Sequence, residues 1–358
     1  MPSWPRLLGV SAVLAPVSLL AACGGGGGGG TGPDPVVPTH TVAVTVFYDE
    51  NNDGMAQPTE VGRVPGVEVN VGGRTALTEK LTGRATVTGV REGSQALSLN
   101  ASTVPAYYVS TSNPPAVNVV EGAQVMVPLT LPIDPNRPFV YMAFGDSITE
   151  GDGSVSHPGG YKGLLRDMLR AHFGGAVEVE GEAQSGSKSD VGAERIGGSL
   201  NRVRPAYTII MYGTNDFVRA ECQREFPCFT IDALRDMVGA ARSARSLPIL
   251  STIPPVQPEG NAPDRNGWVG RMNELIKPMA AQQRVPLADV YGAFMRQQNL
   301  SALFADRLHP NDRGYEIIAA EIFNAITRPL GAAATASGHR RLLPLLLAPP
   351  SAPTRPRG

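Results

Sequence analysis

The chain has 358 residues, of which 42% are hydrophobic and 18% are charged, and its formal net charge is -1 at pH 7. This composition is typical of a globular protein with a sizeable apolar core, and it excludes a collagen-like or wholly disordered chain. The nearly balanced charge provides no broad basic surface, so we expect no nucleic-acid partner.

The N-terminus has the pattern of an export signal. Arg6 precedes a mostly apolar stretch at 7–22, roughly 16 residues long, whereas a membrane-spanning helix needs ~20. The stretch ends in Leu20-Ala-Ala-Cys23, which resembles the lipobox of bacterial lipoproteins. The resemblance implies that residues 1–22 are a signal peptide cleaved before Cys23, and that Cys23 carries lipid. The alternative is an ordinary signal peptide that happens to precede a cysteine.

The segments at 23–39 and 331–358 differ from the rest of the chain. Residues 23–39 begin with a run of glycines after Cys23 and continue with several prolines, which is typical of a flexible tether. Residues 331–358 are rich in Ala, Pro and Arg, and we predict a disordered tail. We therefore expect an exported protein that a lipid anchor holds on a bacterial membrane, facing the periplasm or the cell surface.

Residues 40–132 have the pattern of short strands. Val42, Val44 and Val46 alternate with other residues, and further short apolar runs are separated by Gly, Pro and Asn. An alternation with period two and no helical period is typical of strands, so this segment predicts a small β-sandwich.

An acidic turn follows the first of these strands. The sequence Asp49-Glu-Asn-Asn-Asp-Gly54 has oxygen-bearing side chains at alternate positions, and Glu60 stands where a terminal ligand is expected. The candidate Ca²⁺ ligands are Asp49, Asn51, Asp53, Met55 and Glu60. The alternative is an Asx-rich hairpin turn that holds no ion. The stretch from 46 to 69 resembles the opening of SdrD B-like or prealbumin-like β-domains, which implies a spacer with an optional structural Ca²⁺.

Residues 138–330 alternate between apolar runs and helical patterns. The apolar runs lie at 139–144, 176–179, 207–212, 249–253 and 285–287. Such an alternation predicts a five-stranded parallel sheet with helices on both faces, which is a three-layer α/β/α domain. Ligands of such sheets bind beyond the carboxyl ends of the strands.

Polar clusters stand at those strand ends and in the last loop. They are Gly145-Asp-Ser147, Ser185-Gly-Ser187, Gly213-Thr-Asn-Asp216 and Asp306-Arg-Leu-His309. Four clusters in this order resemble the SGNH (GDSL-type) hydrolases over about residues 139–328. The resemblance implies a serine esterase with Ser147 as nucleophile, His309 as base and Asp306 as the carboxylate that orients the base. It also implies an oxyanion hole made of the Ser147 and Gly186 N–H groups and the Asn215 amide.

The chemistry of acyl transfer explains these residue types. A serine hydroxyl becomes nucleophilic when an imidazole takes its proton, and a carboxylate holds that imidazole in the required tautomer. Asp306 and His309 are three positions apart, so one loop can bring them together. One departure from the family concerns the second cluster, where Gly181 and Ala183 replace an Asn and a Gly that often precede the Ser-Gly pair. The bracing of the Gly186 loop is therefore the least certain part of the predicted site.

Cys222 and Cys228 lie directly after the third cluster, with five residues between them. In an exported protein we expect them to form a disulfide, the alternative being two reduced thiols. The loop at 217–229 also carries aromatic residues, and we hypothesise that Phe226 lines a substrate pocket.

The function that these patterns favour is hydrolysis of a carboxylic ester outside the cytoplasm, through a Ser147 acyl-enzyme and without a catalytic cofactor. The substrate class stays open between a short-chain, a lipid and a glycan-linked ester. Two alternatives remain: an acyltransferase that uses the same residues to acylate a glycan, and a non-catalytic adhesin-like module.

Overall fold

The computed structural model describes residues 37–110, 116–260 and 264–330. The predicted signal peptide, the lipidation site Cys23, most of the tether and the tail from 331 onward lie outside the described residues. No helix within the described ranges is long and apolar enough to cross a membrane.

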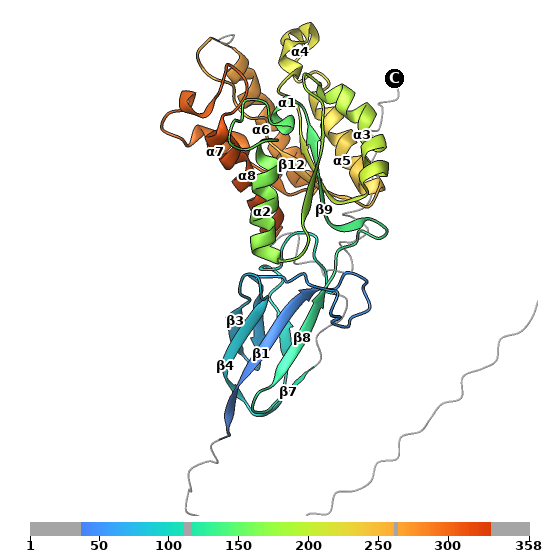
Figure 1. The fold of residues 1–358 in the computed structure, drawn as a ribbon, viewed down its shortest axis with the longest axis vertical. Helices are drawn as coiled ribbons and strands as arrows, with labels where there is room; N and C mark the ends of the chain where they lie inside the picture. Colours follow the sequence, from blue (N-terminus) through green and yellow to red (C-terminus); the bar gives the residue numbers. More distant parts are fainter. Residues whose placement is uncertain (1–36, 111–115, 261–263, 331–358) are drawn as a thin grey trace, which may run out of the picture. The chain divides into compact units, whose positions relative to one another are not determined.

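The N-terminal part is built of strands, as its alternating valines predict (Figure 1). The strands are β1 (Thr39–Tyr48), β2 (Glu68–Val71), β3 (Arg74–Leu77), β4 (Arg84–Arg91), β5 (Gly93–Gln95), β6 (Leu97–Leu99), β7 (Val117–Val119) and β8 (Gln124–Leu129). They form two three-stranded sheets, β4-β1-β8 and β3-β2-β6, and the pair β5-β7. Val44 of the first sheet and Val69 of the second are fully buried in one hydrophobic cluster, so the two sheets share a core.

The C-terminal part contains the five-stranded parallel sheet that the sequence predicts. The strands are β9 (Arg137–Gly145), β10 (Glu178–Ala183), β11 (Pro205–Met211), β12 (Leu247–Ser251) and β13 (Leu287–Ala288), in the order β10-β9-β11-β12-β13. From β9 the chain first adds β10 on one side and then β11 on the other. A sheet of this kind opens a crevice where its strand order reverses, beyond the carboxyl end of β9.

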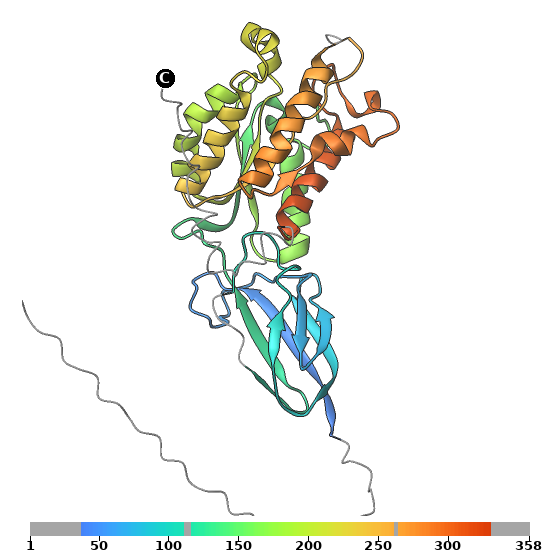
Figure 2. The ribbon, with the colours of Figure 1, turned by 180° about the vertical axis from the view of Figure 1, so that it is seen from behind.

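Helices cover both faces of this sheet (Figures 1 and 2). The long ones are α2 (Tyr161–Phe173), α3 (Ser189–Val203), α5 (Thr230–Ser243), α6 (Arg265–Gln282) and α8 (Asp312–Thr327). The short ones are α1 (Ser147–Glu150), α4 (Ala220–Arg224), α7 (Val290–Met295) and the 3₁₀ turns η1 (Asp216–Val218) and η2 (Ser301–Leu303).

Strand β9 shows why the helices divide into two layers. Tyr141 and Ala143 belong to the cluster that contains apolar residues of α2 and α8. Met142 and Phe144 belong to the other cluster, with residues of α3, α5 and α6. Successive side chains of a strand point to opposite faces, so a continuous apolar run buries both faces of the sheet. The three-layer α/β/α prediction is confirmed.

Candidate active site

Ser147 stands where β9 turns sharply into a helix of four residues. Asp146 caps α1, since its side chain accepts a hydrogen bond from the Ile148 N–H at 3.0 Å, and Gly151 (φ 108°) ends the helix. A Cβ on Gly145 would lie 2.6 Å from the Met211 carbonyl oxygen and even closer to Thr149, so only glycine fits before the turn. The turn fixes Ser147 at the carboxyl end of β9 with a largely buried side chain.

His309 lies between Ser147 and Asp306. Its Nε2 is 3.0 Å from Ser147 Oγ, and its Nδ1 is 2.8 Å from Asp306 Oδ2. Burial by itself would raise the pKa of the Asp306 carboxyl, but hydrogen bonds from His309 and Leu308 outweigh it and lower that pKa. The structure therefore brings the three predicted residues together in the order that proton transfer from a serine requires.

The three predicted oxyanion donors come from separate strand ends. The Asn215 side chain is buried, and its Nδ2 donates to the Ser187 carbonyl oxygen at 3.1 Å, which joins the third cluster to the second. Gly186 has a φ of 75°, and open space lies where its Cβ would be. Outside helices and strands, the described residues include no backbone hydrogen bond from the Gly186 N–H. Ser147 opens α1, and the first residues of a helix have no acceptor within it.

Arg195 holds the end of β10, where Gly181 and Ala183 stand in place of the Asn and Gly of the family pattern. One of its terminal nitrogens donates to the carbonyl oxygens of Gly145 at 3.1 Å and of Glu182 at 2.6 Å. The same nitrogen donates to the Tyr212 hydroxyl at 2.6 Å, and the guanidinium lies 4.1 Å from the centre of the Phe144 ring. This side chain links the ends of β9 and β10 to the residue after β11. Sequence reasoning missed it, since no motif marks an arginine in the middle of α3.

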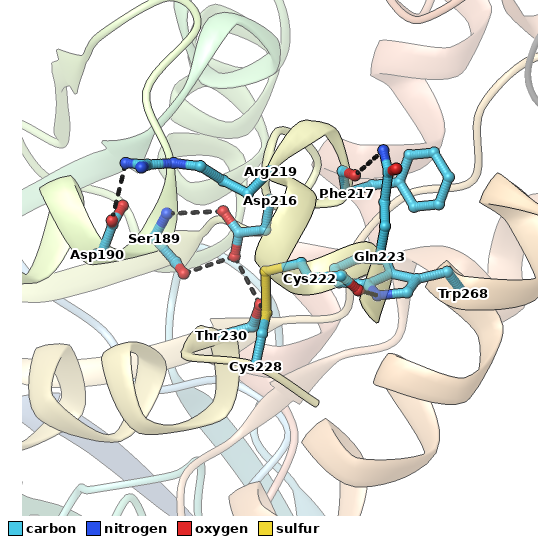
Figure 3. The surroundings of a disulfide bond; sticks show 10 residues. All are labelled: Ser189, Asp190, Asp216, Phe217, Arg219, Cys222, Gln223, Cys228, Thr230 and Trp268. Atoms are coloured by element: carbon cyan, nitrogen blue, oxygen red, sulfur yellow. Dashed lines mark hydrogen bonds and ion pairs between the residues drawn. A yellow bond between two sulfur atoms is a disulfide. The ribbon is translucent and has the colours of Figure 1, made fainter. Parts of the chain in front are cut away.

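Asp216, the residue after Asn215, forms hydrogen bonds with Ser189 and Thr230 (Figure 3). Its carboxylate is fully buried and accepts hydrogen bonds from the Ser189 N–H at 2.9 Å, the Ser189 hydroxyl at 2.6 Å and the Thr230 hydroxyl at 2.7 Å. Burial raises the pKa of Asp216, and these hydrogen bonds oppose the rise. The carboxylate ties the first residues of α3 and α5 to the turn that carries Asn215. This role was also missed from the sequence.

Cys222 and Cys228 form a disulfide, as predicted (Figure 3). Trp268 Nε1 donates to the Cys222 carbonyl oxygen at 3.1 Å, which attaches the loop to α6. Phe217 packs against Trp268 with ring centres 5.9 Å apart, so it belongs to the core. Phe226 is 42% exposed, with the Arg271 guanidinium 5.0 Å from its ring centre. A pocket role for Phe226 stays a prediction.

Asp146 is a buried carboxyl group with a raised pKa. Its carboxyl is buried, and Oδ2 has no hydrogen-bond partner among the described residues. Burial raises the pKa of Asp146 to about 7, and the nearby Asp216 adds to the rise while His309 opposes it. A carboxyl group that titrates near neutral pH therefore stands next to the candidate nucleophile.

Hydrogen bonds attach the segment after α1, at residues 154–156, to the first residue of α8. The Asp312 carboxylate accepts hydrogen bonds from the Ser154 hydroxyl at 2.6 Å, the Val155 N–H at 2.9 Å and the Ser156 N–H at 3.0 Å. Gly153, with a φ of 92°, packs so tightly that a Cβ there would lie 2.9 Å from His309 Cβ. The segment that follows Ser147 thus contacts the loop that carries His309.

The predicted calcium loop is a closed turn. The Asp49 carboxylate accepts from the N–H groups of Asp53 and Gly54, at 3.2 and 2.9 Å. The Glu60 carboxylate accepts from the N–H groups of Glu50 and Gln57, both at 3.0 Å. Across the part of the chain that the structure describes, no three His, Cys, Asp or Glu residues are grouped so as to hold a metal ion. The oxygen-rich donors suit Ca²⁺, but these hydrogen bonds satisfy both buried carboxylates. Calcium binding by this loop, with Asn51 and Met55, stays a prediction.

The model of the GDSL-like Lipase/Acylhydrolase family matches residues 143–317. A search of curated proteins found no significant match. A lipase/acylhydrolase from Enterococcus faecalis is 24% identical, covers 53% of this chain and 97% of its own length, and has a TM-score of 0.44. A catalytic mutant of an acetylxylan esterase from Geobacillus stearothermophilus is 21% identical, covers 54% of this chain and 94% of its own, and also has a TM-score of 0.44.

Proposed function

We propose that this protein, whose residues 143–317 match the model of the GDSL-like lipase/acylhydrolase family, is a member of that family and hydrolyses carboxylic esters through a covalent intermediate on Ser147. The match to this family supports a serine hydrolase. The observation that carries the proposal is the position of His309, with one ring nitrogen 3.0 Å from Ser147 Oγ and the other 2.8 Å from Asp306 Oδ2.

The proposed reaction has two acyl transfers. Ser147 Oγ attacks the ester carbonyl carbon while its proton moves to His309 Nε2, and Asp306 stabilises the imidazolium that forms. The N–H groups of Ser147 and Gly186 and the amide of Asn215 donate to the oxyanion. The bond to the leaving oxygen then breaks as Nε2 returns the proton to it. In the second transfer a water molecule attacks the acyl carbon while His309 Nε2 takes its proton. Nε2 then returns the proton to Ser147 Oγ, which releases the acid and restores the Ser147 hydroxyl.

As the substrate we propose a small or glycan-linked ester rather than a triglyceride. The segment from Gly151 to Gly160 is rich in glycine and polar residues, so it supplies no apolar lid of the kind that covers a long acyl chain. Its start is held by hydrogen bonds to Asp312 and by the close contact of Gly153 with His309. These features favour a small or polar substrate.

Fluorophosphonate labelling tests the proposed nucleophile. The full chain should be labelled and should turn over short-chain esters, whereas Ser147→Ala should do neither. Ser94→Ala, which changes an exposed serine of β5, is the matched control and should behave like the unmutated chain. If the unmutated chain is not labelled and has no esterase activity, the proposal fails.

The location of the protein is a second part of the proposal, and it rests on the sequence around Cys23. We expect lipid on Cys23 and a membrane-anchored enzyme that meets its substrate outside the cytoplasm. Incorporation of a fatty-acid probe should be lost in Cys23→Ala, and this variant should appear in the soluble fraction. Unchanged membrane association of the variant would count against the anchor.

A further inference from the structure

Asp152 places a second carboxylate beside the nitrogen that transfers the proton. Its Oδ2 lies 3.9 Å from His309 Nε2, which is itself 3.0 Å from Ser147 Oγ. In the reaction proposed above, Nε2 gives its proton to the leaving oxygen, so the leaving alcohol has to lie beside Nε2. Asp152 therefore borders the part of the site that the leaving alcohol occupies.

Contacts to both main chain and side chain hold Asp152 in this position. Its N–H donates to the Ser147 carbonyl oxygen at 3.1 Å, and its own carbonyl oxygen accepts from the Tyr315 hydroxyl at 2.7 Å. Oδ2 accepts from the Ser185 hydroxyl at 3.1 Å. A side chain that is already ordered loses little further entropy when it binds a ligand, so its hydrogen bond contributes more fully to affinity.

The Asp152 carboxylate can accept a further hydrogen bond. The side chain is 44% exposed, and within the described residues its one ion-pair partner is His309. The nearby Lys162 ammonium donates to the carbonyl oxygens of Thr149 and Glu150 and forms no ion pair with Asp152. Among the hydrogen bonds of the described chain, none is donated to Asp152 Oδ1. An ionised carboxylate only accepts hydrogen bonds, so the group that meets it has to be a donor.

We infer that Asp152 selects esters whose leaving alcohol carries a second hydroxyl next to the ester oxygen, as a sugar or a glycerol ester does. This inference rests on the proposed function. When the ester oxygen lies at His309 Nε2, a hydroxyl on the adjacent carbon is beside Asp152 and donates to its free oxygen. The Ser185 hydroxyl that donates to Oδ2 shows that this carboxylate accepts from a hydroxyl group in the same site.

Two esters that share an acyl group test this selection in the full chain. Glycerol monobutyrate and propyl butyrate differ only in the hydroxyls of the three-carbon alcohol. Asp152→Ala should lower kcat/KM for glycerol monobutyrate by roughly 10-fold, the size expected for a lost hydrogen bond to a charged group. It should change kcat/KM for propyl butyrate by less than about 2-fold, since that ester makes no such bond.

Two further variants separate the possible roles of the residue. Asp152→Asn keeps an acceptor oxygen but loses the charge, so its loss on glycerol monobutyrate should be smaller than that of Asp152→Ala. Glu150→Gln removes an exposed charge from the same turn and should leave the ratio of the two kcat/KM values unchanged. Thermal melting of each variant checks that it is folded.

Three results would overturn the inference. If Asp152→Ala lowered kcat/KM equally for both esters, Asp152 would position His309 and would not select the alcohol. A larger loss on butyrylcholine than on glycerol monobutyrate would assign the carboxylate to an ammonium group. No loss on either ester in Asp152→Ala, with Ser147 still labelled by fluorophosphonate, would remove the inference and leave the proposed function intact. By contrast, an unmutated chain that is neither labelled nor active would remove both.

Discussion

The Asp306 carboxylate accepts hydrogen bonds from both the main chain and the side chain of His309. Its Oδ1 accepts from the His309 N–H at 2.7 Å, and its Oδ2 lies 2.8 Å from Nδ1. The Leu308 N–H also donates to Oδ1 at 2.7 Å. One side chain thus shapes the loop and orients the ring that the loop carries.

Replacing Asp306 by Asn should separate these two roles. The Asn oxygen can still accept from the loop N–H groups, so the melting temperature should change little. The amide cannot hold the imidazole in the required tautomer or stabilise its charged form, so kcat should fall by roughly 10³- to 10⁴-fold. Steady-state kinetics with a short-chain ester provide the measurement. A loss below about 10-fold would show that Asp306 does not orient the base.

Gly153→Ala should reduce activity because its Cβ would come within 2.7 Å of the Pro310 carbonyl oxygen and 2.9 Å of His309 Cβ. The positive φ of 92° adds backbone strain. The clash should shift His309 away from Ser147. A shift of even part of an ångström should lower kcat by about 10- to 100-fold.

Gly163→Ala is the matched control for this glycine. Gly163 lies inside α2, and no atom lies within 4 Å of the position of its missing Cβ. Alanine there should stabilise the protein by about 0.5–1 kcal/mol and leave kcat unchanged. Equal kcat values for the two variants would mean that the contact at Gly153 does not position His309.

Asp146 should make the stability of the protein depend on pH near neutrality. Burial raises the pKa of Asp146 to about 7 from an ordinary value of 3.8. Between these values the folded protein holds a proton that the unfolded chain has released, so the free energy of unfolding falls as pH rises through this window. Asp146→Asn cannot ionise, and its free energy of unfolding should lack this fall.

Urea unfolding of both proteins at pH 5 and pH 8 measures the difference. The wild type should lose on the order of 3 kcal/mol relative to Asp146→Asn between the two pH values. Parallel pH profiles for the two proteins would show that Asp146 ionises normally in the folded state.

Asp216→Ala should destabilise the protein by about 2–4 kcal/mol, because it leaves buried donors of Ser189 and Thr230 without an acceptor. Asp190→Ala removes a neighbouring carboxylate that pairs with Arg219 at 3.1 Å on a more exposed surface (Figure 3). That change should cost less than about 1 kcal/mol. Urea unfolding of the two variants, which should differ clearly in midpoint, checks both values.

Calcium binding at the turn from Asp49 to Glu60 can be tested by thermal melting. A ligand that binds only the folded state raises the melting temperature, so Ca²⁺ should raise it relative to a chelator. Glu60→Gln should remove most of this difference. Equal melting temperatures of the wild type with Ca²⁺ and with chelator would assign the loop to the ion-free turn.

The sequence predicts the central strands well and the edge strands less accurately. The run at 139–144 lies within β9 (Arg137–Gly145), because a strand buried on both faces is continuously apolar. The predicted strand at 176–179 is instead β10 (Glu178–Ala183), an edge strand that carries Glu178, Glu180 and Glu182. Its hydrophobicity could not mark it, because none of its side chains is fully buried.

The same limit applies to the site. Ser147, Asp306 and His309 stand in short recognisable patterns, so the sequence could single them out as candidates, and the structure places His309 within hydrogen-bond distance of the other two. Arg195 and Asp216 act through partners that are distant in sequence: Gly145 is 50 residues from Arg195, and Ser189 is 27 residues from Asp216. Only the folded chain brings such pairs together, so no local pattern predicts them.

The hydrogen bonds of Asp312 also bear on how this enzyme could evolve. They fix Ser154, Val155 and Ser156, so the chain between Ser156 and Gly160 begins from an anchored point. Residues inserted after Ser156 would lengthen this segment without displacing Ser147. Changes in the length of the segment would therefore leave the spacing of the reacting atoms unchanged.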